Sequence, residues 1–241
     1  DFATSETTIV YYADDENEIG RFSSENRVSV PLEQVPEHVQ QAVLAAEDRT
    51  FYENSGISIP GIARALWNNL TSDSTQGGST ITQQYVKNYY LTQDQTYWRK
   101  IEEIIIALKV DAQVSKDQIL EDYLNTVYFG RGAYGIQTGG QAWFRTDVEE
   151  LSVSEGVTLA ALLQSPSGYD PRNGPQAEAA LSARFDYVID GMVSEGWLSE
   201  GEAAAASLPE TAPPPADNAL SGENGHVLAT VRAELLALGY T

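Results

Sequence analysis

The sequence has no cysteine among its 241 residues, few basic residues and no long apolar run. Without cysteine there is no disulfide framework, no thiolate metal site and no cysteine nucleophile. The two histidines, His38 and His226, lie far apart along the chain, which argues against a histidine metal site or a Ser-His-Asp triad. No stretch of about 18 apolar residues occurs, so the sequence predicts no transmembrane helix.

Basic residues are scarce relative to acidic ones. The chain has 14 Lys and Arg against 35 Asp and Glu, a formal net charge of −21. Because binding to a phosphate backbone relies on a basic face, this balance excludes nucleic acid as the main partner. The chain starts with Asp and carries no signal sequence, so we expect a mature or excised part of a longer protein.

The residue patterns predict a mainly helical protein preceded by a small β-arm. Residues 8–32 are rich in β-branched and aromatic residues around a polar turn, which favours short strands. From Pro36 onward the apolar spacing becomes helical, and the first helix ends at Glu47. Its buried face is predicted to contain Val39, Ala42, Val43 and Ala46. Further helices are expected near 59–70, 97–114, 115–127, 152–164 and 176–205, before a Pro-rich break.

The helix at 97–114 separates an apolar stripe from an acidic position. The stripe consists of Ile101, Ile104, Ile105 and Leu108. At about 100° per residue Glu103 points away from this stripe, and Arg99, four residues earlier, shares its face.

The next helix begins with a capping-box pattern, Ser115 and Gln118. Glu121 and Asn125 lie together on one face of this helix. The opposite, buried face is predicted to contain Ile119, Leu120, Tyr123, Leu124 and Val127.

Two features suggest chemistry on sugars. Glu47 and Glu103 lie on separate helices, and paired carboxylates from different elements suit acid–base chemistry at a sugar carbon. The segment "QGGSTITQQYVKN" combines glycines, which permit close backbone approach, with hydroxyls and amides that suit sugars and phosphates. Taken alone, each also fits a surface glutamate or a polar loop before a capped helix.

Five motifs occur in order and at consistent spacing: "EDRTFYENSG", "GGSTITQQYVKN", "RKIEEIIIAL", "KDQILEDYLNTVYFGRGAYGI" and "LAALLQSPSGYDP". Together they closely resemble the five motifs of the peptidoglycan glycosyltransferases, glycosyltransferase family 51. These are the polymerase domains of class A penicillin-binding proteins and their monofunctional relatives. The resemblance covers about residues 20–200.

The resemblance implies a mainly α, lysozyme-like helical domain with a small membrane-associated jaw subdomain. With it, we expect an N-terminal β-arm and linker at 1–35, the glycosyltransferase domain at 36–205, and a Pro-rich break with a linker helix at 206–241. The family polymerises lipid II into glycan strands with inversion at the anomeric carbon. It works at the outer face of the bacterial cytoplasmic membrane, and we expect this chain itself to lack the membrane anchor. We expect fusion to a transpeptidase domain in the full protein.

Carried over by motif position, Glu47 resembles the general base and Glu103 the second essential carboxylate, near the donor pyrophosphate. The expected substrate contacts are Arg64, Ser79, Thr80, Gln83, Gln84, Lys87, Arg99, Lys100 and Gln164. The expected structural or cleft-supporting residues are Asp48, Phe51, Asn54, Glu121 and Asn125. No organic cofactor is implied, and a divalent cation, Mg²⁺ or Mn²⁺, could share the charge of the pyrophosphate.

The expected partners are lipid II, the growing glycan strand and a membrane surface. The aromatic and apolar residues expected at that surface are Tyr89, Tyr90, Leu91, Tyr97 and Trp98. Three positions depart from the family pattern: Asn54 replaces histidine, Gln95 replaces a basic residue, and Arg145 stands where glycine is expected. The alternatives are a lysozyme-like hydrolase or lytic transglycosylase, and a non-catalytic cell-wall binding module.

Overall fold

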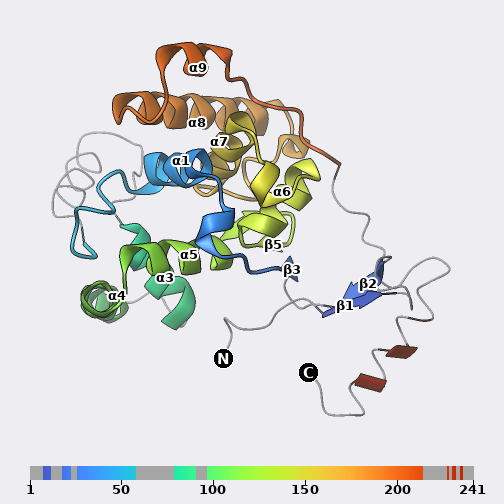
Figure 1. Cartoon of the computed structure of the whole chain (residues 1–241), viewed down its shortest axis with the longest axis horizontal. Helices are drawn as coiled ribbons and strands as arrows, with labels where there is room; N and C mark the ends of the chain where they lie inside the picture. Colours follow the sequence, from blue (N-terminus) through green and yellow to red (C-terminus); the bar gives the residue numbers. More distant parts are fainter. Residues whose placement is uncertain are drawn as a thin grey trace.

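The computed structural model describes residues 8–11, 18–22, 26–57, 79–90 and 97–213, together with residues 227, 230, 231, 234 and 235. The predicted mainly α fold is confirmed, and Figure 1 shows helices forming the body of the molecule. The helices are α1 (Glu37–Glu47), α3 (Ile81–Tyr90), α4 (Tyr97–Gln113), α5 (Lys116–Thr126), α6 (Ile136–Phe144), α7 (Val153–Leu162), α8 (Pro175–Ser194) and α9 (Glu200–Ala205). Short 3-10 turns are η1 (Leu32–Gln34), η2 (Val148–Glu150) and η3 (Pro171–Asn173). The helix expected near 59–70 lies outside the described residues.

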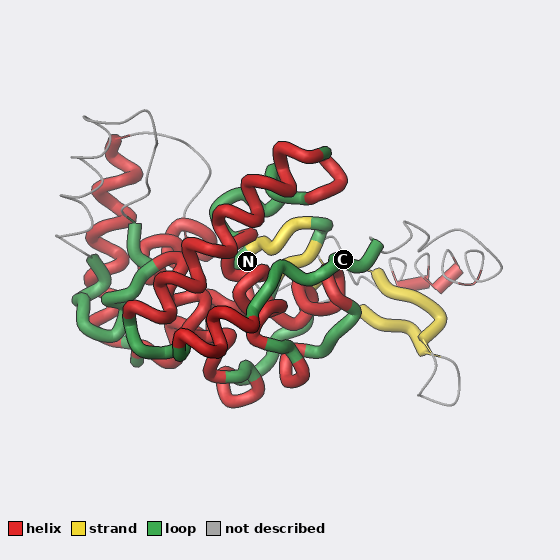
Figure 2. Tube along the Cα trace, turned by 90° about the horizontal axis from the view of Figure 1, so that it is seen from above, coloured by secondary structure: helices red, strands yellow, loops and turns green. Residues whose placement is uncertain are grey.

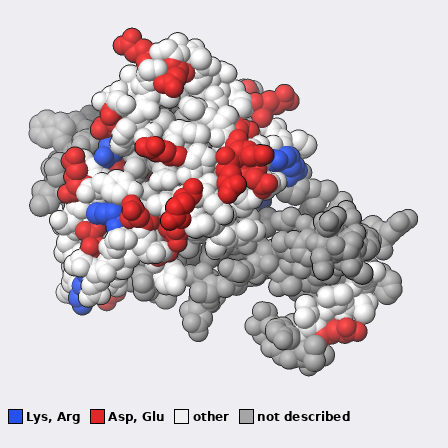
Figure 3. All heavy atoms as spheres, in the orientation of Figure 1, with Lys and Arg blue, Asp and Glu red and all other residues white. Residues whose placement is uncertain are grey.

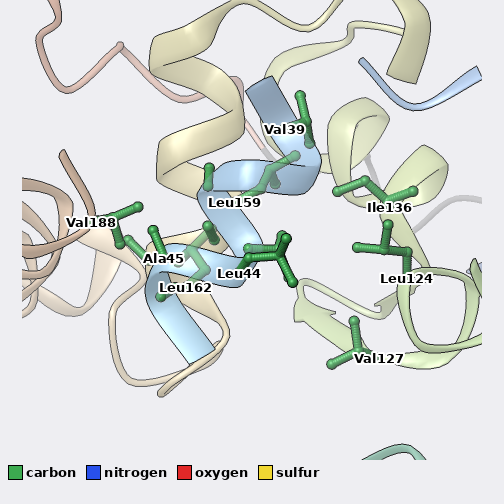
Figure 4. Packing of buried hydrophobic residues seen from close by; sticks show 14 of the residues in the cluster. Val39, Leu44, Ala45, Leu124, Val127, Ile136, Leu159, Leu162 and Val188 are labelled. Atoms are coloured by element: carbon green, nitrogen blue, oxygen red, sulfur yellow. The ribbon is translucent and has the colours of Figure 1, made fainter. Parts of the chain in front are cut away.

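Helix α1 packs against both α7 and α8 at the centre of the core. Its predicted face is confirmed, because Val39, Ala42, Val43 and Ala46 are all buried. Helix α7 is apolar on nearly every side, as expected of a helix enclosed by others. Figure 4 shows Ala45 of α1 beside Leu162 and Val188. At Gly156 a Cβ atom would lie 2.9 Å from Val39 Cγ2, so this glycine permits the close approach of α7 to α1.

Helix α5 packs on α3. Its predicted buried face is confirmed, and it consists of Ile119, Leu120, Tyr123, Leu124 and Val127. The capping box is only half formed. The Ser115 hydroxyl accepts a hydrogen bond from the Gln118 backbone, but the Gln118 side chain donates to Glu121 and Asp122 instead.

Glu121 and Asn125 tie α5 to the segment that precedes α1. Asn125 exchanges two hydrogen bonds with the backbone of Val30, at 2.9 and 2.8 Å. Glu121 accepts a 2.7 Å hydrogen bond from the backbone N–H of Leu32. These two side chains therefore satisfy backbone hydrogen-bonding groups of residues 30 and 32, which pair with no strand in the described part of the chain.

Helix α4 turns its apolar stripe outward. Ile101, Ile105 and Leu108 are 46, 47 and 39% exposed, whereas Glu103 is only 2% exposed. The sequence separates the acidic position from the stripe, but helical periodicity alone does not say which side faces the protein. An exposed apolar stripe beside a buried carboxylate is the reverse of the usual surface helix and indicates an interaction face.

The predicted β-arm is confirmed in its described strands. Strand β1 (Thr8–Tyr11) pairs antiparallel with β2 (Glu18–Phe22), and Figure 2 shows this hairpin outside the helical body. A second sheet joins β3 (Asn26–Arg27), β5 (Ala133–Tyr134) and β4 (Tyr128–Gly130). Strand β3 pairs with β5 in parallel, so the β4–β5 hairpin holds the chain where it enters the helical body.

The surface reflects the charge imbalance, and acidic side chains outnumber basic ones on the face shown in Figure 3. Within the described residues, no helix is both long enough and apolar enough to cross a membrane.

Candidate active site

Glu47 is the last residue of α1, and both oxygens of its carboxylate accept hydrogen bonds. Gln84 Nε2 of α3 donates to Oε2 at 2.8 Å, and Arg184 Nη2 of α8 lies 3.4 Å from Oε1. The Glu47 side chain is 14% exposed, so it is enclosed yet still reachable. A carboxylate has about four acceptor positions, which leaves room for a proton from a substrate.

Arg184 was missed by the sequence analysis. Its Nη2 also donates to the carbonyl oxygen of Ala46 at 2.8 Å, and its guanidinium lies 4.4 Å from the centroid of the Tyr187 ring. The guanidinium of Arg49 lies 5.2 Å from the centroid of the same ring, and its Nε donates to the Ala45 carbonyl. Two arginines therefore satisfy carbonyl groups at the negative end of α1, where cations are favourable. Nothing local in the sequence of α8 distinguishes Arg184 from an ordinary surface arginine.

Gln84 is itself held in one orientation by Tyr123 of α5. The buried Tyr123 hydroxyl donates to Gln84 Oε1 at 3.2 Å, so the amide nitrogen is directed at Glu47. Burial raises the pKa of Tyr123 well above its usual value, and the nearby charge of Glu47 raises it further. The hydroxyl therefore stays protonated as a donor across the physiological range.

Asp48, the second residue of the acidic pair, joins the end of α1 to the start of α3. Both oxygens of its carboxylate accept hydrogen bonds from Asn54 Nδ2, at 3.1 and 3.0 Å. The carboxylate also accepts from the Thr50 hydroxyl and from the Ile81 N–H, each at 3.3 Å. Burial raises the pKa of Asp48, although these hydrogen bonds oppose the shift. The two neighbouring acids thus have different surroundings, since Asp48 is only 8% exposed and fully engaged within the protein.

Asn54 bridges this junction to the start of α5. Its Oδ1 accepts from Lys116 Nζ at 3.3 Å and from the Gly56 N–H at 3.1 Å, while its Nδ2 donates to Asp48. The Lys116 ammonium also lies 4.7 Å from the centroid of the buried Phe51 ring and pairs with Asp111. Asn54 and Phe51 are therefore parts of the scaffold around Glu47.

The second predicted carboxylate, Glu103, pairs with Lys100 one turn earlier on α4. Lys100 Nζ also donates to the Ser79 hydroxyl at 3.0 Å. The Glu103 side chain is 2% exposed and that of Lys100 is 47% exposed. The Glu103 carboxylate is therefore buried, and the Lys100 ammonium that it binds is the exposed member of the pair.

The predicted substrate contacts differ in exposure: some are buried, some are exposed, and some lie outside the described residues. Thr80 and Gln83 are 1% exposed and cap the start of α3, where the Gln83 side chain accepts from the Thr80 N–H at 3.0 Å. A direct sugar contact by either stays a prediction. Lys87 and Gln164 are exposed, and Glu102, the neighbour of Glu103, is exposed too. Arg64, Gln95 and the side chain of Arg99 lie outside the described residues, as do Leu91 and the side chains of Tyr90 and Tyr97.

No group of three or more His, Cys, Asp or Glu side chains in the described part of the chain is arranged to hold a metal ion. The carboxylate expected near the pyrophosphate, Glu103, already has Lys100 as its cation. A divalent ion at this point would depend mainly on substrate phosphates for its ligands.

The helical fold places the partly exposed carboxylate of Glu47 between α3 and α8, an arrangement that an acid–base enzyme could use. Comparison with known proteins gives the family, because the model of the family described as "Transglycosylase" matches residues 15–193. The chain belongs to the transglycosylase family. The resemblance drawn from the five motifs and the enzyme class, a peptidoglycan glycosyltransferase, are therefore confirmed.

Named relatives agree with this assignment. The chain is 50% identical to penicillin-binding protein 1A of Mycobacterium tuberculosis over 220 residues, covering 88% of this chain and 26% of the relative. It is 45% identical to penicillin-binding protein 1A of Mycolicibacterium smegmatis over 94% of this chain and 30% of the relative. The crystal structure of penicillin-binding protein 1A from Haemophilus influenzae matches with a TM-score of 0.51 and 21% identity, over 97% of this chain and 24% of that chain. This structural likeness supports the fold alone.

Proposed function

We propose that this chain polymerises lipid II into glycan strands, with Glu47 as the general base. The carboxylate would take the proton from the 4-hydroxyl of the acceptor GlcNAc, and the oxygen would attack C1 of the donor MurNAc. The pyrophosphate would leave from the opposite face, which gives inversion. The observation that carries the proposal is the Glu47 carboxylate, fixed by Gln84 and Arg184 and still partly exposed.

The proposed role of Glu103 is to position Lys100 for the leaving group. A carboxylate that is 2% exposed cannot itself lie against a substrate in this conformation. By holding one side of the half-exposed ammonium, it directs the remaining N–H donors of Lys100, beside Ser79, toward an incoming phosphate. Preorganised cations of this kind stabilise charge that develops on a departing pyrophosphate.

The proposed membrane contact is the stripe of α4. Trp98 is 75% exposed and extends the row of Ile101, Ile105 and Leu108 by one turn. Tyr89 of α3 is also 39% exposed. Tryptophan and tyrosine favour the membrane interface, and a row of exposed aliphatic side chains gains by leaving water. We place the domain at the outer face of the cytoplasmic membrane, where its lipid-linked substrate would be found.

The relatives also support a longer protein. The chain spans 26% of the Mycobacterium tuberculosis relative and 30% of the Mycolicibacterium smegmatis relative. We propose that a transpeptidase domain follows the glycosyltransferase domain in the full protein, as the names of these relatives as penicillin-binding proteins suggest.

The test is to incubate the chain with purified lipid II and, separately, with finished glycan strands. Polymer from lipid II is the expected result, whereas release of fragments from finished strands would instead identify a hydrolase or lytic transglycosylase. If neither polymer nor fragments form, the chain is a binding module and not an enzyme. Glu47→Gln should abolish polymer formation, and Glu37→Gln at the other end of α1 is the matched control, because Glu37 is exposed and its described hydrogen bond is to Gln41 of the same helix.

A further inference from the structure

Residues 206–213, which follow α9, stay on the protein surface although they form neither helix nor strand. Ala206 and Leu208 pack against the hydrophobic core, and the Ser207 N–H donates to the Ser154 hydroxyl at 3.3 Å. Figure 1 shows this segment passing from α9 along α6. The sequence places a Pro-rich break here, so an ordered path is more than composition predicts. We call residues 206–213 the outgoing segment.

Arg131, in the turn between β4 and β5, donates hydrogen bonds to the outgoing segment. Its side chain is 2% exposed, and its guanidinium lies 3.7 Å from the centroid of the Trp143 ring. Nη1 donates to the carbonyl of Ala212 at 2.6 Å and Nη2 to the hydroxyl of Thr211 at 3.3 Å. The Ala212 N–H in turn donates to the Trp143 carbonyl at 2.7 Å, so both backbone groups of Ala212 are hydrogen-bonded to the protein.

Asp170 fixes the guanidinium of Arg131 by accepting from Nε at 3.1 Å and from Nη2 at 3.2 Å. Such a bidentate pair orients the planar fork and leaves the remaining donors directed at the outgoing segment. Asp170 also accepts from Arg172, whose side chain is 53% exposed and has no described contact with residues 206–213.

Arg145 holds the next carbonyl group. It is the residue after α6 and adopts a left-handed backbone conformation with φ of +64°, which costs an arginine about 1 kcal/mol relative to glycine. Its Nη2 donates to the carbonyl of Pro213 at 2.7 Å, and Nη1 donates to the carbonyl of Gln141 at 3.1 Å. Within the described part of the chain, Arg131 and Arg145 are the two non-glycine residues with positive φ. Both strained residues bind the same segment.

We propose that the β4–β5 hairpin and the C-terminal end of α6 form a docking site for the outgoing segment, which fixes the direction in which the polypeptide leaves after Pro213. The ligand that this site fits is an extended backbone presenting successive carbonyl groups to two arginines. Since β3 docks on β5 of the same hairpin, one hairpin holds the chain where it enters and where it leaves. This goes beyond the proposed catalysis and uses none of its residues.

Hydrogen exchange of the whole 241-residue chain tests the proposal. In the wild type, amides of the outgoing segment should exchange far more slowly than in a free peptide of the same sequence. Arg145→Gly should raise exchange of the Thr211 and Ala212 amides by about tenfold or more, the equivalent of one charged hydrogen bond. Glycine suits the left-handed conformation, so this variant should keep its core protection, and Arg145→Lys should lie between the two. Arg172→Gln is the matched control and should leave these amides unchanged.

A spin label gives an independent readout, because the chain has no cysteine. A label on Glu210→Cys, an exposed position with no described contact to the docking site, should be restricted in the wild-type background and mobile with Arg145→Gly. The proposal is overturned if the wild-type segment exchanges like the free peptide, or if Arg145→Gly changes neither exchange nor label mobility.

Discussion

Replacing Gln84 by leucine tests whether the position of Glu47 depends on a side chain from another helix. Leucine has a similar volume but can neither donate to Glu47 nor accept from Tyr123. The lost contact with Glu47 is a 2.8 Å hydrogen bond to a charged acceptor. Such bonds contribute about 1.5–3 kcal/mol, so kcat/KM should fall by about 10- to 150-fold.

The same change should also lower stability, for a different reason. Tyr123 is fully buried, and without Gln84 its hydroxyl has no described acceptor. A buried hydroxyl without a hydrogen-bond acceptor lowers the free energy of unfolding by about 1–3 kcal/mol. Combining Gln84→Leu with Tyr123→Phe removes both partners, so the double variant should recover most of that stability while its activity stays low.

The assays are polymer formation from labelled lipid II and unfolding in urea, on the two single variants and the double variant. Tyr123→Phe alone is the matched control. It keeps the Gln84 amide and removes only the hydroxyl that orients it, so its activity should fall by no more than about threefold, the effect of one weak neutral hydrogen bond. If Gln84→Leu polymerises as fast as this control, Gln84 does not position the base. If the double variant recovers activity together with stability, the loss in Gln84→Leu came from the fold and not from Glu47.

Three further outcomes are expected. Arg184→Met should lower kcat by at least about tenfold in the lipid II assay, because α1 loses a C-terminal cap and Glu47 its cation; unchanged kcat would contradict this. Trp98→Ser together with Ile105→Ser should reduce flotation with liposomes severalfold and change the unfolding free energy by only about 0.5 kcal/mol, since both positions are exposed. Asp170→Asn should cost about 3–5 kcal/mol at pH 7 by leaving Arg131 unpaired. Although burial opposes it, hydrogen bonds from Arg172 and Arg131 lower the pKa of Asp170 below its usual 3.8, so the stabilisation is present above that pH and the gap to wild type in urea unfolding should shrink as the pH falls further.

The parts of the fold that sequence could predict are those governed by local periodicity. Val39, Ala42, Val43 and Ala46 recur at helical spacing, and the structure buries all four. Ser115 is an N-cap because its hydroxyl competes well for a free N–H at a helix start. These outcomes depend on residues within one or two turns of each other, so the pattern carries the information.

Contacts between distant residues could not be predicted in this way. Gln84 and Arg184, which hold Glu47, are 37 and 137 residues away from it in the sequence. The motif resemblance identifies Gln84 only as a polar residue for substrate, and Arg184 lies beyond the motifs used. The outward turn of α4 also depends on tertiary packing, because periodicity separates Glu103 from the stripe without saying which side is buried.

The two carboxylates with proposed roles, Glu47 and Glu103, differ in exposure and in hydrogen-bond partners, and this difference argues for different roles. Glu47 is 14% exposed, and one of its two described partners, Gln84, is neutral. Its other partner, Arg184, also donates to the Ala46 carbonyl at 2.8 Å and so keeps a hydrogen-bond acceptor when the Glu47 carboxylate takes a proton. Glu103 is 2% exposed, and its described partner is the Lys100 ammonium. The buried Glu103 is therefore suited to holding Lys100 in place, whereas the more exposed Glu47 is suited to exchanging a proton with a substrate.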